Sequence, residues 1–460
     1  MREFTLDFSA SPKPIFHQLY TYFKNEIRDG KLEKGDYLPS IRGCARSFGI
    51  SKNTVESAYQ LLVSEGYLRN IAKKGFCVTY EPEANEREGA PAEAEDAAGF
   101  AVTTDFRYGN IELGTFPFRH WNKVRNLVIA QNQSVYAVEG TNQGEYPLRK
   151  ELSRLLYESR GVTAAPDQIV VGAAPQQLVM LLSQLLDVKK HRIGVENPGY
   201  DGARNTFLNH GFRVHPVSLS GSGVSLGELA ESGANVMYVS PSQQFRNRIT
   251  MPADKRAELA EWTRSLGEYL IEDDYEWEFK YEEGILPAIQ SMIPEKAVYI
   301  GRISKALLPV FNLSYMVLPS GLLSGFHSKV PEYDQPVSRL DQLTFARYLS
   351  DGYWYKHLQQ MRRLYEEKQR YFSEALERYM PGKARAEGKD TGLHAFLIVR
   401  TDRSEEELIE AALEKGVRVY GTARYWLRPG DEYPTILLGY GALGREEISA
   451  GVKALAEAWF

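Results

Sequence analysis

The chain has 460 residues, 43% of them hydrophobic and 25% charged, and a net charge of −5. This length predicts two or three domains, and the composition is typical of globular proteins in water. No run approaches the roughly 18–20 apolar residues that a membrane helix needs, and the charged start M-R-E-F-T-L-D-F has no signal-peptide core. Because there are only two cysteines, Cys44 and Cys77, a disulfide framework is not expected and a reducing cytoplasm is the predicted location.

The charge is distributed unevenly along the chain. Residues 1–80 hold 12 Lys and Arg against 8 Asp and Glu, whereas residues 81–102 hold 7 acids and one arginine. The balances are +4 and −6, which leaves −3 for residues 103–460. A basic first region, an acidic connector and a nearly neutral remainder indicate that only the first region contacts a polyanion.

The first region carries the pattern of three helices. A helix is expected to begin at Pro14 and to stop at Gly30. Ser40 can cap a short second helix, Gly49 can make a tight turn, and Ser51 can cap a third helix. The apolar positions at helical spacing are Ile15, Leu19, Tyr22, Phe23, Ile27, then Ile41, Cys44, Ala45, Phe48, then Val55, Ala58, Tyr59, Leu61 and Leu62. Two helices joined by a short glycine turn are typical of the helix-turn-helix, whose second helix enters the major groove of DNA.

Basic and hydrogen-bonding residues surround this motif. The third predicted helix starts with types suited to base edges or phosphates, namely Ser51, Lys52, Asn53 and Thr54. After Gly66 the sequence alternates like two strands around Lys73-Lys74-Gly75, which predicts a basic hairpin, or wing. An ordinary pair of helices is the alternative, but the wing together with Arg42 and Arg46 favours DNA binding.

These motifs resemble those of the GntR winged-helix family over residues 10–80. L-P-S-I-R-G-C-A, S-K-N-T-V and E-G-Y-L stand where the family has L-P-S-x-R-x-L-A, S-R-x-T-V and E-G-(Y/W)-(L/I). The resemblance implies double-stranded promoter DNA as a partner, with contacts from Arg42, Arg46, Ser51, Lys52, Asn53, Thr54 and Lys74. Lys52 replaces an arginine common in the family, so it should hold phosphate but lose the bidentate grip on guanine.

Residues 81–102 are rich in Ala, Glu and Pro and show no apolar periodicity. They predict a flexible acidic linker between a winged-helix domain at residues 1–80 and a second domain at residues 103–460. A coil of this length spans roughly 25 Å.

Residues 103–460 alternate between strand and helix patterns. This alternation predicts a mostly parallel α/β sheet up to about residue 340, with function at the carboxyl ends of its strands. From about residue 341 a helical stretch and a few strands predict a small α+β lobe that extends to residue 460.

Two predicted strand ends carry complementary chemistry. Y-L-I-E-D-D-Y (269–275) ends in acids and a tyrosine, and the run from Ala297 to Ile300 is followed by G-R-I-S-K, with its lysine at Lys305. A carboxylate and an amine suit a cofactor with a basic ring nitrogen and an aldehyde, which describes pyridoxal 5'-phosphate (PLP). The alternative for Ser-Lys alone is a solvated lysine at a strand end.

The second domain resembles fold-type I aminotransferases and, with the first domain, the MocR/GabR group of PLP-binding regulators. The motifs are N-Q-G-E-Y-P-L-R (142–149), E-N-P-G-Y (196–200), S-P-S-Q-Q-F (240–245), I-E-D-D-Y-E-W-E-F (271–279), S-K-A-L-L-P (304–309) and Arg424 in Y-G-T-A-R-Y. The resemblance implies that Lys305 is the Schiff-base lysine, that Asp273 pairs with the ring nitrogen, and that Tyr275 bonds the ring hydroxyl. It further implies cofactor contacts from Tyr200, Ala174, Pro175 and Ser304, and a ligand carboxylate on Arg424. No metal site is predicted.

Several positions depart from the family pattern. Asn312 replaces an arginine that pairs with the PLP phosphate, and Arg302 replaces a Ser or Thr. We therefore hypothesise that Arg302 neutralises the phosphate. Asp201-Gly202 stands where relatives often have a second arginine, and Arg246 and Arg248 replace small residues, which leaves the identity of the effector open.

The predicted function is a transcriptional regulator that senses an amino acid or related amine. The effector would displace Lys305 and form an external aldimine. The small lobe would then close and change how the two winged-helix domains of a dimer (the heads) are presented to DNA. The resemblance also implies a homodimer with swapped heads and two operator half-sites. The alternatives are a regulator with a degenerate PLP site or one that senses PLP itself, and an active aminotransferase with a DNA-binding appendage. Residual half-transamination is compatible with the predicted regulator.

Overall fold

The computed structural model describes residues 14–28, 31–71, 74–80, 101–131, 133–220, 223–244, 250–279, 286–303, 305–329, 333–388, 393–428 and 433–460. The chain forms two compact units, Met1–Ala98 and Gly99–Phe460. Nearly all of the predicted linker, residues 81–100, lies outside the described residues, as do Lys73, Arg246, Arg248 and the candidate cofactor residue Ser304.

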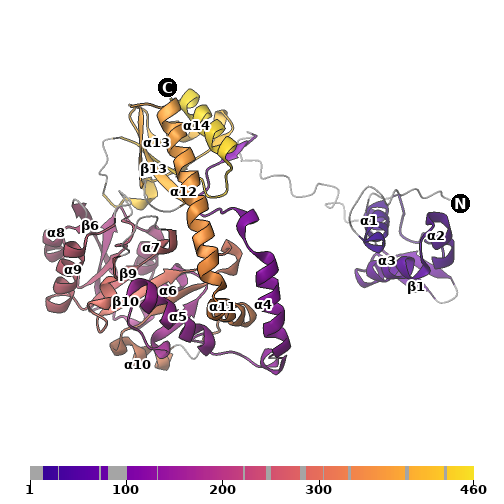
Figure 1. Cartoon of the computed structure of the whole chain (residues 1–460), viewed down its shortest axis with the longest axis horizontal. Helices are drawn as coiled ribbons and strands as arrows, with labels where there is room; N and C mark the ends of the chain where they lie inside the picture. Colours follow the sequence, from indigo (N-terminus) through magenta and orange to yellow (C-terminus); the bar gives the residue numbers. More distant parts are fainter. Residues whose placement is uncertain are drawn as a thin grey trace. The chain divides into compact units, whose positions relative to one another are not determined.

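The first unit is a winged helix (Figure 1). It contains α1 (Ile15–Arg28), α2 (Ile41–Phe48), α3 (Lys52–Ser64) and an antiparallel hairpin of β1 (Leu68–Ile71) and β2 (Gly75–Val78). The predicted caps are confirmed, because the side chains of Ser40 and Ser51 accept the backbone N–H groups of Gly43 and Thr54, both at 3.1 Å. Gly49, at φ 64°, ends α2 in the left-handed conformation that glycine adopts without strain.

The core of this unit lies between α1, α3 and the hairpin. Leu19, Phe23, Val55, Tyr59 and Leu62 are fully buried there. Ile15 is the first residue of α1 and is 44% exposed, so the buried face of the helix begins at Leu19. Both cysteines are buried and free of disulfides.

The second unit is built on an eight-stranded mixed sheet with the order β4-β11-β10-β9-β8-β5-β6-β7. Strands β10, β9, β8, β5 and β6 form a parallel block, whereas β11 is antiparallel to β4 and β10, and β7 is antiparallel to β6. The bounds are β4 (Ile169–Gly172), β5 (Arg192–Asn197), β6 (Arg213–Ser220), β7 (Gly223–Val224), β8 (Val236–Val239), β9 (Tyr269–Asp273), β10 (Ala297–Arg302) and β11 (Ser314–Val317). The prediction of a mostly parallel α/β sheet is confirmed.

Helices cover both faces of this sheet. Along β10, Tyr299 belongs to the hydrophobic cluster on one face and Val298 and Ile300 to the cluster on the other, because successive side chains of a strand point to opposite faces. The first face is covered by α4 (Phe118–Gln131), α5 (Tyr146–Arg160), α11 (Arg339–Ser350), α8 (Leu226–Ser232) and α9 (Ala253–Ser265). The second face is covered by α6 (Pro175–Leu185), α7 (Asp201–Asn209) and α10 (Ser320–Lys329).

A smaller α+β lobe follows in the chain. Its four-stranded antiparallel sheet has the order β12-β13-β16-β15 and packs with α13 (Glu405–Glu414) and α14 (Arg445–Trp459). The strands are β12 (Ala384–Glu387), β13 (His394–Val399), β15 (Tyr420–Gly421) and β16 (Thr435–Gly439). In addition, β3 (Thr104–Asp105) pairs in parallel with β14 (Val417–Arg418), so the start of the second unit is tied to this lobe.

The long helix α12 (Tyr353–Tyr379) connects the two lobes of the second unit (Figure 1). Trp354 and Met361 near its start are buried in the large-lobe core, whereas Phe372 and Leu376 near its end are buried in the small-lobe core. Among the described helices, none is both long and apolar enough to cross a membrane.

Candidate functional site

The candidate DNA-binding residues lie on one helix start, one preceding helix and the wing. Four of these residues are exposed: Arg42 and Arg46 on α2, Ser51 directly before α3 and Lys74 directly before β2. Lys52 and Asn53 in the first turn of α3 are also exposed, whereas Thr54 is half-buried. The hydroxyl groups of Ser51 and Thr54 lie 2.8 Å apart and bond to each other at the start of α3. The side chains of Lys52 and Asn53 are exposed to solvent there.

The candidate ligand pocket lies where strands of the parallel block end. Asp273 is the last residue of β9 and pairs in register with Ile300 of β10, two residues before Arg302. Tyr200 follows β5 and precedes α7, and Pro175 is the first residue of α6 with Ala174 as its N-cap. The hollow takes in about 810 Å³ of space out to its open mouth and is lined by Tyr108, Pro175, Tyr200, Asp201, Asp273, Tyr275, Arg302, Lys305, His394, Phe396, Arg424, Tyr425 and Leu437.

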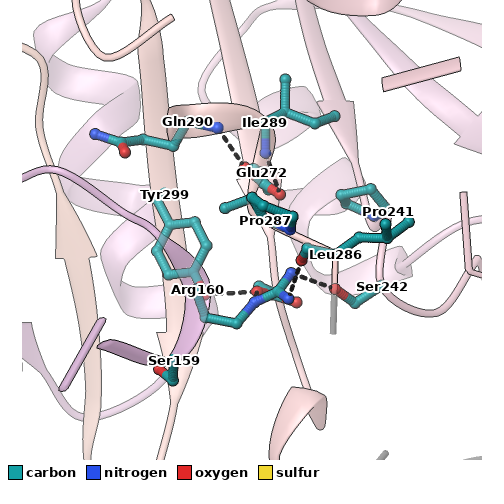
Figure 2. Close-up of polar contacts among 12 residues, drawn as sticks. Ser159, Arg160, Pro241, Ser242, Glu272, Leu286, Pro287, Ile289, Gln290 and Tyr299 are labelled. Carbon is teal, nitrogen blue, oxygen red and sulfur yellow. Dashed lines mark hydrogen bonds and ion pairs between the residues drawn. The ribbon is translucent and has the colours of Figure 1, made fainter. Parts of the chain in front are cut away.

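Three consecutive acids lie at the end of strand β9, with Glu272 and Asp273 inside the strand and Asp274 directly after it, and of the three only Asp273 lines the pocket. Glu272 accepts the backbone N–H groups of Ile289 and Gln290 at 3.0 and 2.9 Å, within the buried region drawn in Figure 2. Asp274 is bound by Arg160 and by the hydroxyl of Tyr299, at 2.6 and 2.5 Å. The carboxylates of Glu272 and Asp274 therefore bond to buried groups of the large lobe, which we call the framework of the site, and they do not line the pocket.

Arg160 anchors this framework. Its guanidinium also donates to the hydroxyl of Ser242 at 2.8 Å and to the backbone carbonyl of Leu286 (Figure 2). Although burial by itself raises the pKa of Asp274, the charge of Arg160 and hydrogen bonds from Ser242 and Tyr299 lower that pKa below its ordinary value. Burial raises the pKa of Glu272, which lies 3.8 Å from the guanidinium of Arg256.

Asp273 is buried, with 4% of its surface exposed, and lines the pocket. The hydroxyl of Tyr238 donates to its Oδ2, whereas its Oδ1 has no hydrogen-bond partner among the described residues. Burial raises the pKa of Asp273 to about 6 despite the hydrogen bond from Tyr238. A buried carboxylate with one unsatisfied oxygen is stabilised by a cationic donor, which a protonated ring nitrogen supplies.

Lys305 is surrounded by aromatic rings and acids. Its Nζ lies 2.7 Å from Oε1 of Glu276 and contacts the hydroxyl of Tyr108. It lies 4.1 Å from the ring centroid of Tyr108 and 5.5 Å from that of Tyr275. Sequence reasoning missed Glu276, Tyr108 and His394; the acid of Glu276 was visible in I-E-D-D-Y-E-W-E-F, but nothing local marked its proximity to the lysine.

The remaining predicted residues are placed as follows. The hydroxyl of Tyr275 donates to the backbone carbonyl of Gln243 at 2.9 Å. Burial raises the pKa of Tyr200 to about 12, and its ring lies so close to Gly202 that a Cβ there would meet it at 2.4 Å. Arg302 lines the pocket, whereas Asn312 is exposed at φ 43° and is absent from the described pocket lining.

Arg424 lies at the side of the pocket formed by the small lobe. Its guanidinium donates to the hydroxyl of Tyr425 at 2.6 Å, and its Nε lies 3.6 Å from Oδ2 of Asp201. The side chain of Arg424 is 66% exposed, so this ion pair is open to water and to exchange with a ligand carboxylate.

These features fit PLP. The pocket offers a primary amine at Lys305, a buried carboxylate oxygen at Asp273 that needs a donor, and the ring of Tyr200. It also offers the cation of Arg302 and the N-terminus of α6, both of which suit a phosphate.

Comparisons with known proteins support the folds of both units. The model of the bacterial regulatory proteins of the gntR family matches residues 16–78. The chain is 34% identical over 452 residues to the HTH-type transcriptional regulator YdeL of Bacillus subtilis (strain 168), covering 97% of each protein. It is 28% identical to the probable rhizopine catabolism regulatory protein MocR of Rhizobium meliloti, covering 97% of this chain and 94% of that protein. It is 27% identical to the pyridoxine biosynthesis transcriptional regulator PdxR of Corynebacterium glutamicum, covering 94% and 93%.

Solved structures similar to the second unit are aminotransferases. The multiple substrate aminotransferase of Thermococcus profundus superposes with a TM-score of 0.71 at 22% identity, covering 78% of this chain and 91% of that one. The kynurenine aminotransferase of Pyrococcus horikoshii gives a TM-score of 0.70 at 23% identity, covering 77% and 90%. A winged helix joined to an aminotransferase fold defines a DNA-binding transcriptional regulator with an aminotransferase-like domain. The chain belongs to the MocR-type subfamily of GntR transcriptional regulators, which confirms the family and fold class that the sequence predicted.

Proposed function

We propose that this regulator binds PLP at Lys305 and senses an amino acid or related amine that competes with this lysine for the cofactor. The observation that carries the proposal is that Lys305 and the buried Asp273 line the same pocket, and that Oδ1 of Asp273 has no donor among the described residues. PLP supplies an aldehyde that forms a reversible C=N bond with amines.

The chain's own residues hold and orient the cofactor in this proposal. Asp273 keeps the ring nitrogen protonated, and Tyr200 packs on the ring. Tyr275 reaches the ring hydroxyl by giving up or sharing its bond to Gln243. Arg302 neutralises the phosphate together with the start of α6 at Ala174 and Pro175. Ser304, which precedes Lys305 in the sequence, is proposed as a further cofactor contact.

Arg424 is proposed to bind a carboxylate of the effector. Its pair with Asp201 is the contact that such a ligand exchanges. Since Arg424 belongs to the small lobe and Lys305 to the large lobe, one ligand that contacts both favours closure of the lobes.

The output of the proposed sensor is DNA binding. Arg42, Arg46 and Lys74 are proposed to contact phosphates, and the start of α3 with Ser51, Lys52, Asn53 and Thr54 to enter the major groove. We further propose a cytoplasmic homodimer with swapped heads that reads two operator half-sites. The aminotransferase fold serves sensing here, and slow half-transamination is compatible with it.

A regulator that responds to PLP itself, with a weakened cofactor site, is the second candidate. Two observations favour it: the exposed Asn312 outside the pocket lining of the described residues, and the similarity to a regulator named for pyridoxine biosynthesis.

The visible absorption of the purified protein tests the proposal. Wild type should be yellow and bleached by borohydride, and Lys305→Ala should show an altered band. Amines titrated against this band, with and without a carboxylate, should shift it at concentrations that also change operator binding. Operator binding that follows PLP alone would support the second candidate, and a protein that takes up no PLP would overturn both.

A further inference from the structure

Glu276 is a buried carboxylate that contacts the candidate cofactor lysine. It follows Tyr275 in the turn between β9 and the 3-10 helix η5 (Trp277–Phe279), and its side chain has no exposed surface. Its Oε1 lies 2.7 Å from Nζ of Lys305 and accepts the hydroxyl of Tyr108 at 3.2 Å, whereas its Oε2 lies 3.7 Å from Nδ1 of His394. Parts of the chain far apart in sequence therefore converge on this acid.

The backbone at Glu276 is in an unfavourable conformation. Its φ of 61° lies in the left-handed region, which costs a residue other than glycine of order 1 kcal/mol. A carboxylate without exposed surface also costs several kcal/mol unless it is paired with a charge. The nearest such charge is the ammonium of Lys305, so burial of Glu276 favours the charged form of this lysine.

This ion pair opposes the bond between Lys305 and a cofactor aldehyde. An amine must be neutral to attack a carbonyl carbon, and an ammonium held at 2.7 Å by a buried carboxylate has no lone pair to offer. The same carboxylate regains its partner whenever the lysine is released from the cofactor.

We propose that Glu276 is the counter-ion of the released Lys305 and thereby favours displacement of the lysine by an incoming amine. In the balanced exchange, the ligand enters as an ammonium, and its nitrogen gives up three protons as it forms the C=N bond. The C=N bond to Lys305 breaks, and the lysine nitrogen takes up these three protons and leaves as the ammonium that Glu276 holds. This proposal rests on the proposed function and adds that sensitivity to amines is set partly by a positioning residue outside the pocket lining.

Other groups facing Lys305 also affect its charge, and they come from several elements. They are Tyr108 after β3, Asp273, Tyr275 and Glu276 at the end of β9, Arg302 of β10 and His394 of β13. The test must therefore separate the effect of Glu276 from the effects of these groups, and it does so by removing the charge of Glu276 while keeping the size of its side chain.

The first measurement uses the protein without PLP. Cyanate carbamylates neutral amines, and peptide mass analysis across a pH series gives the midpoint at which Lys305 becomes reactive. In Glu276→Gln this midpoint should fall by about one pH unit, giving about tenfold more labelling below it, because a nearby opposite charge typically shifts a pKa by 1–3 units. The exposed Lys123 on α4 is an internal reference in every sample.

Glu278→Gln is the matched control. Glu278 is another buried carboxylate, two residues further on in η5, 1% exposed, and burial raises its pKa to about 8. Its replacement should leave the midpoint of Lys305 unchanged. Glu276→Asp keeps the charge at a longer distance, so its midpoint should lie between those of wild type and Glu276→Gln. Equal midpoints in wild type and the Glu276 variants, or an equal shift in Glu278→Gln, would overturn the proposal. If Glu276→Gln does not fold, Glu276→Asp alone decides.

The second measurement uses PLP-loaded protein and methylamine, which has no carboxylate for Arg424. After equilibration and borohydride reduction, the fraction of Lys305 peptide carrying the cofactor reports how far the lysine has been displaced. Glu276→Gln should need about tenfold more methylamine for half-displacement, in proportion to the shift above. No increase would overturn the proposal. If PLP does not bind but the cyanate midpoint moves, the proposed function fails and the ion-pair role of Glu276 stands.

Discussion

Arg160 and Asp274 form an ion pair of 2.6 Å in which the two side chains are 1% and 0% exposed. The pair joins the end of α5 to the residue next to Asp273, and the same guanidinium reaches the loops that carry Ser242 and Leu286 (Figure 2). Since Asp273 immediately precedes Asp274, the framework around Arg160 fixes the strand end on which the proposed site depends.

Arg160→Ala should lower the free energy of unfolding of the second unit by about 3–5 kcal/mol, because it leaves a buried carboxylate without its charge partner. All six tryptophans lie in residues 103–460, so urea unfolding followed by tryptophan fluorescence reports this unit. Arg154→Ala on the same helix is the control, since Arg154 is 45% exposed and its pairs with Glu151 and Glu158 are worth under about 1 kcal/mol. Equal losses in both variants would contradict the central role of Arg160.

Stability of the second unit should fall between about pH 5 and 8, partly because of Glu196. Burial raises the pKa of Glu196 from 4.5 to about 8, so the folded state keeps a proton that the unfolded state loses in this window. The unfolded state then binds fewer protons, and stability decreases as pH rises. In Glu196→Gln this contribution is absent, so the difference in unfolding free energy between variant and wild type should grow with pH in the variant's favour. A difference for Glu196→Gln that stays flat across this pH window would refute the assignment.

Lys52→Ala should weaken operator binding and reduce the slope of log K against log salt by about one, as expected for the loss of one phosphate contact. Lys52→Arg should keep the slope and change the preference for guanine, since only arginine offers a bidentate fork. Lys31, which follows α1, is paired with Glu26 of that helix. Lys31→Ala should therefore leave the affinity for the operator and the salt slope unchanged. Fluorescence anisotropy with operator DNA at several salt concentrations measures them. A loss in Lys31→Ala equal to that in Lys52→Ala would indicate a general charge effect.

Arg302→Ala should reduce PLP affinity by about tenfold or more, since a charged hydrogen bond to phosphate is worth about 1.5–3 kcal/mol. The exposed Arg363 on α12 supplies the control variant Arg363→Ala. Titration of the protein with PLP, followed by absorbance, measures both affinities. If the two variants bind PLP equally well, Arg302 does not compensate for the arginine that Asn312 replaces.

Short-range sequence patterns were sufficient to predict the helices and turns of the first unit and the strand ends of the second unit. Ser40, Gly49 and Ser51 act within a few residues of their own positions, because caps and tight turns are satisfied by neighbouring backbone groups. The order of strand and helix patterns likewise gave the mostly parallel sheet. It also brought Asp273 and Arg302 to one edge, because parallel strands share the edge at which they end.

Only the tertiary structure decided which charges neutralise one another. Glu272, Asp273 and Asp274 are alike in sequence, but Arg160, from a helix more than a hundred residues earlier, commits Asp274 to the framework. The pair of Glu276 with Lys305 and the pair of Asp201 with Arg424 join residues far apart in the chain. The energy of a charge depends on its burial and on its neighbours in space, and the packing of distant elements sets both.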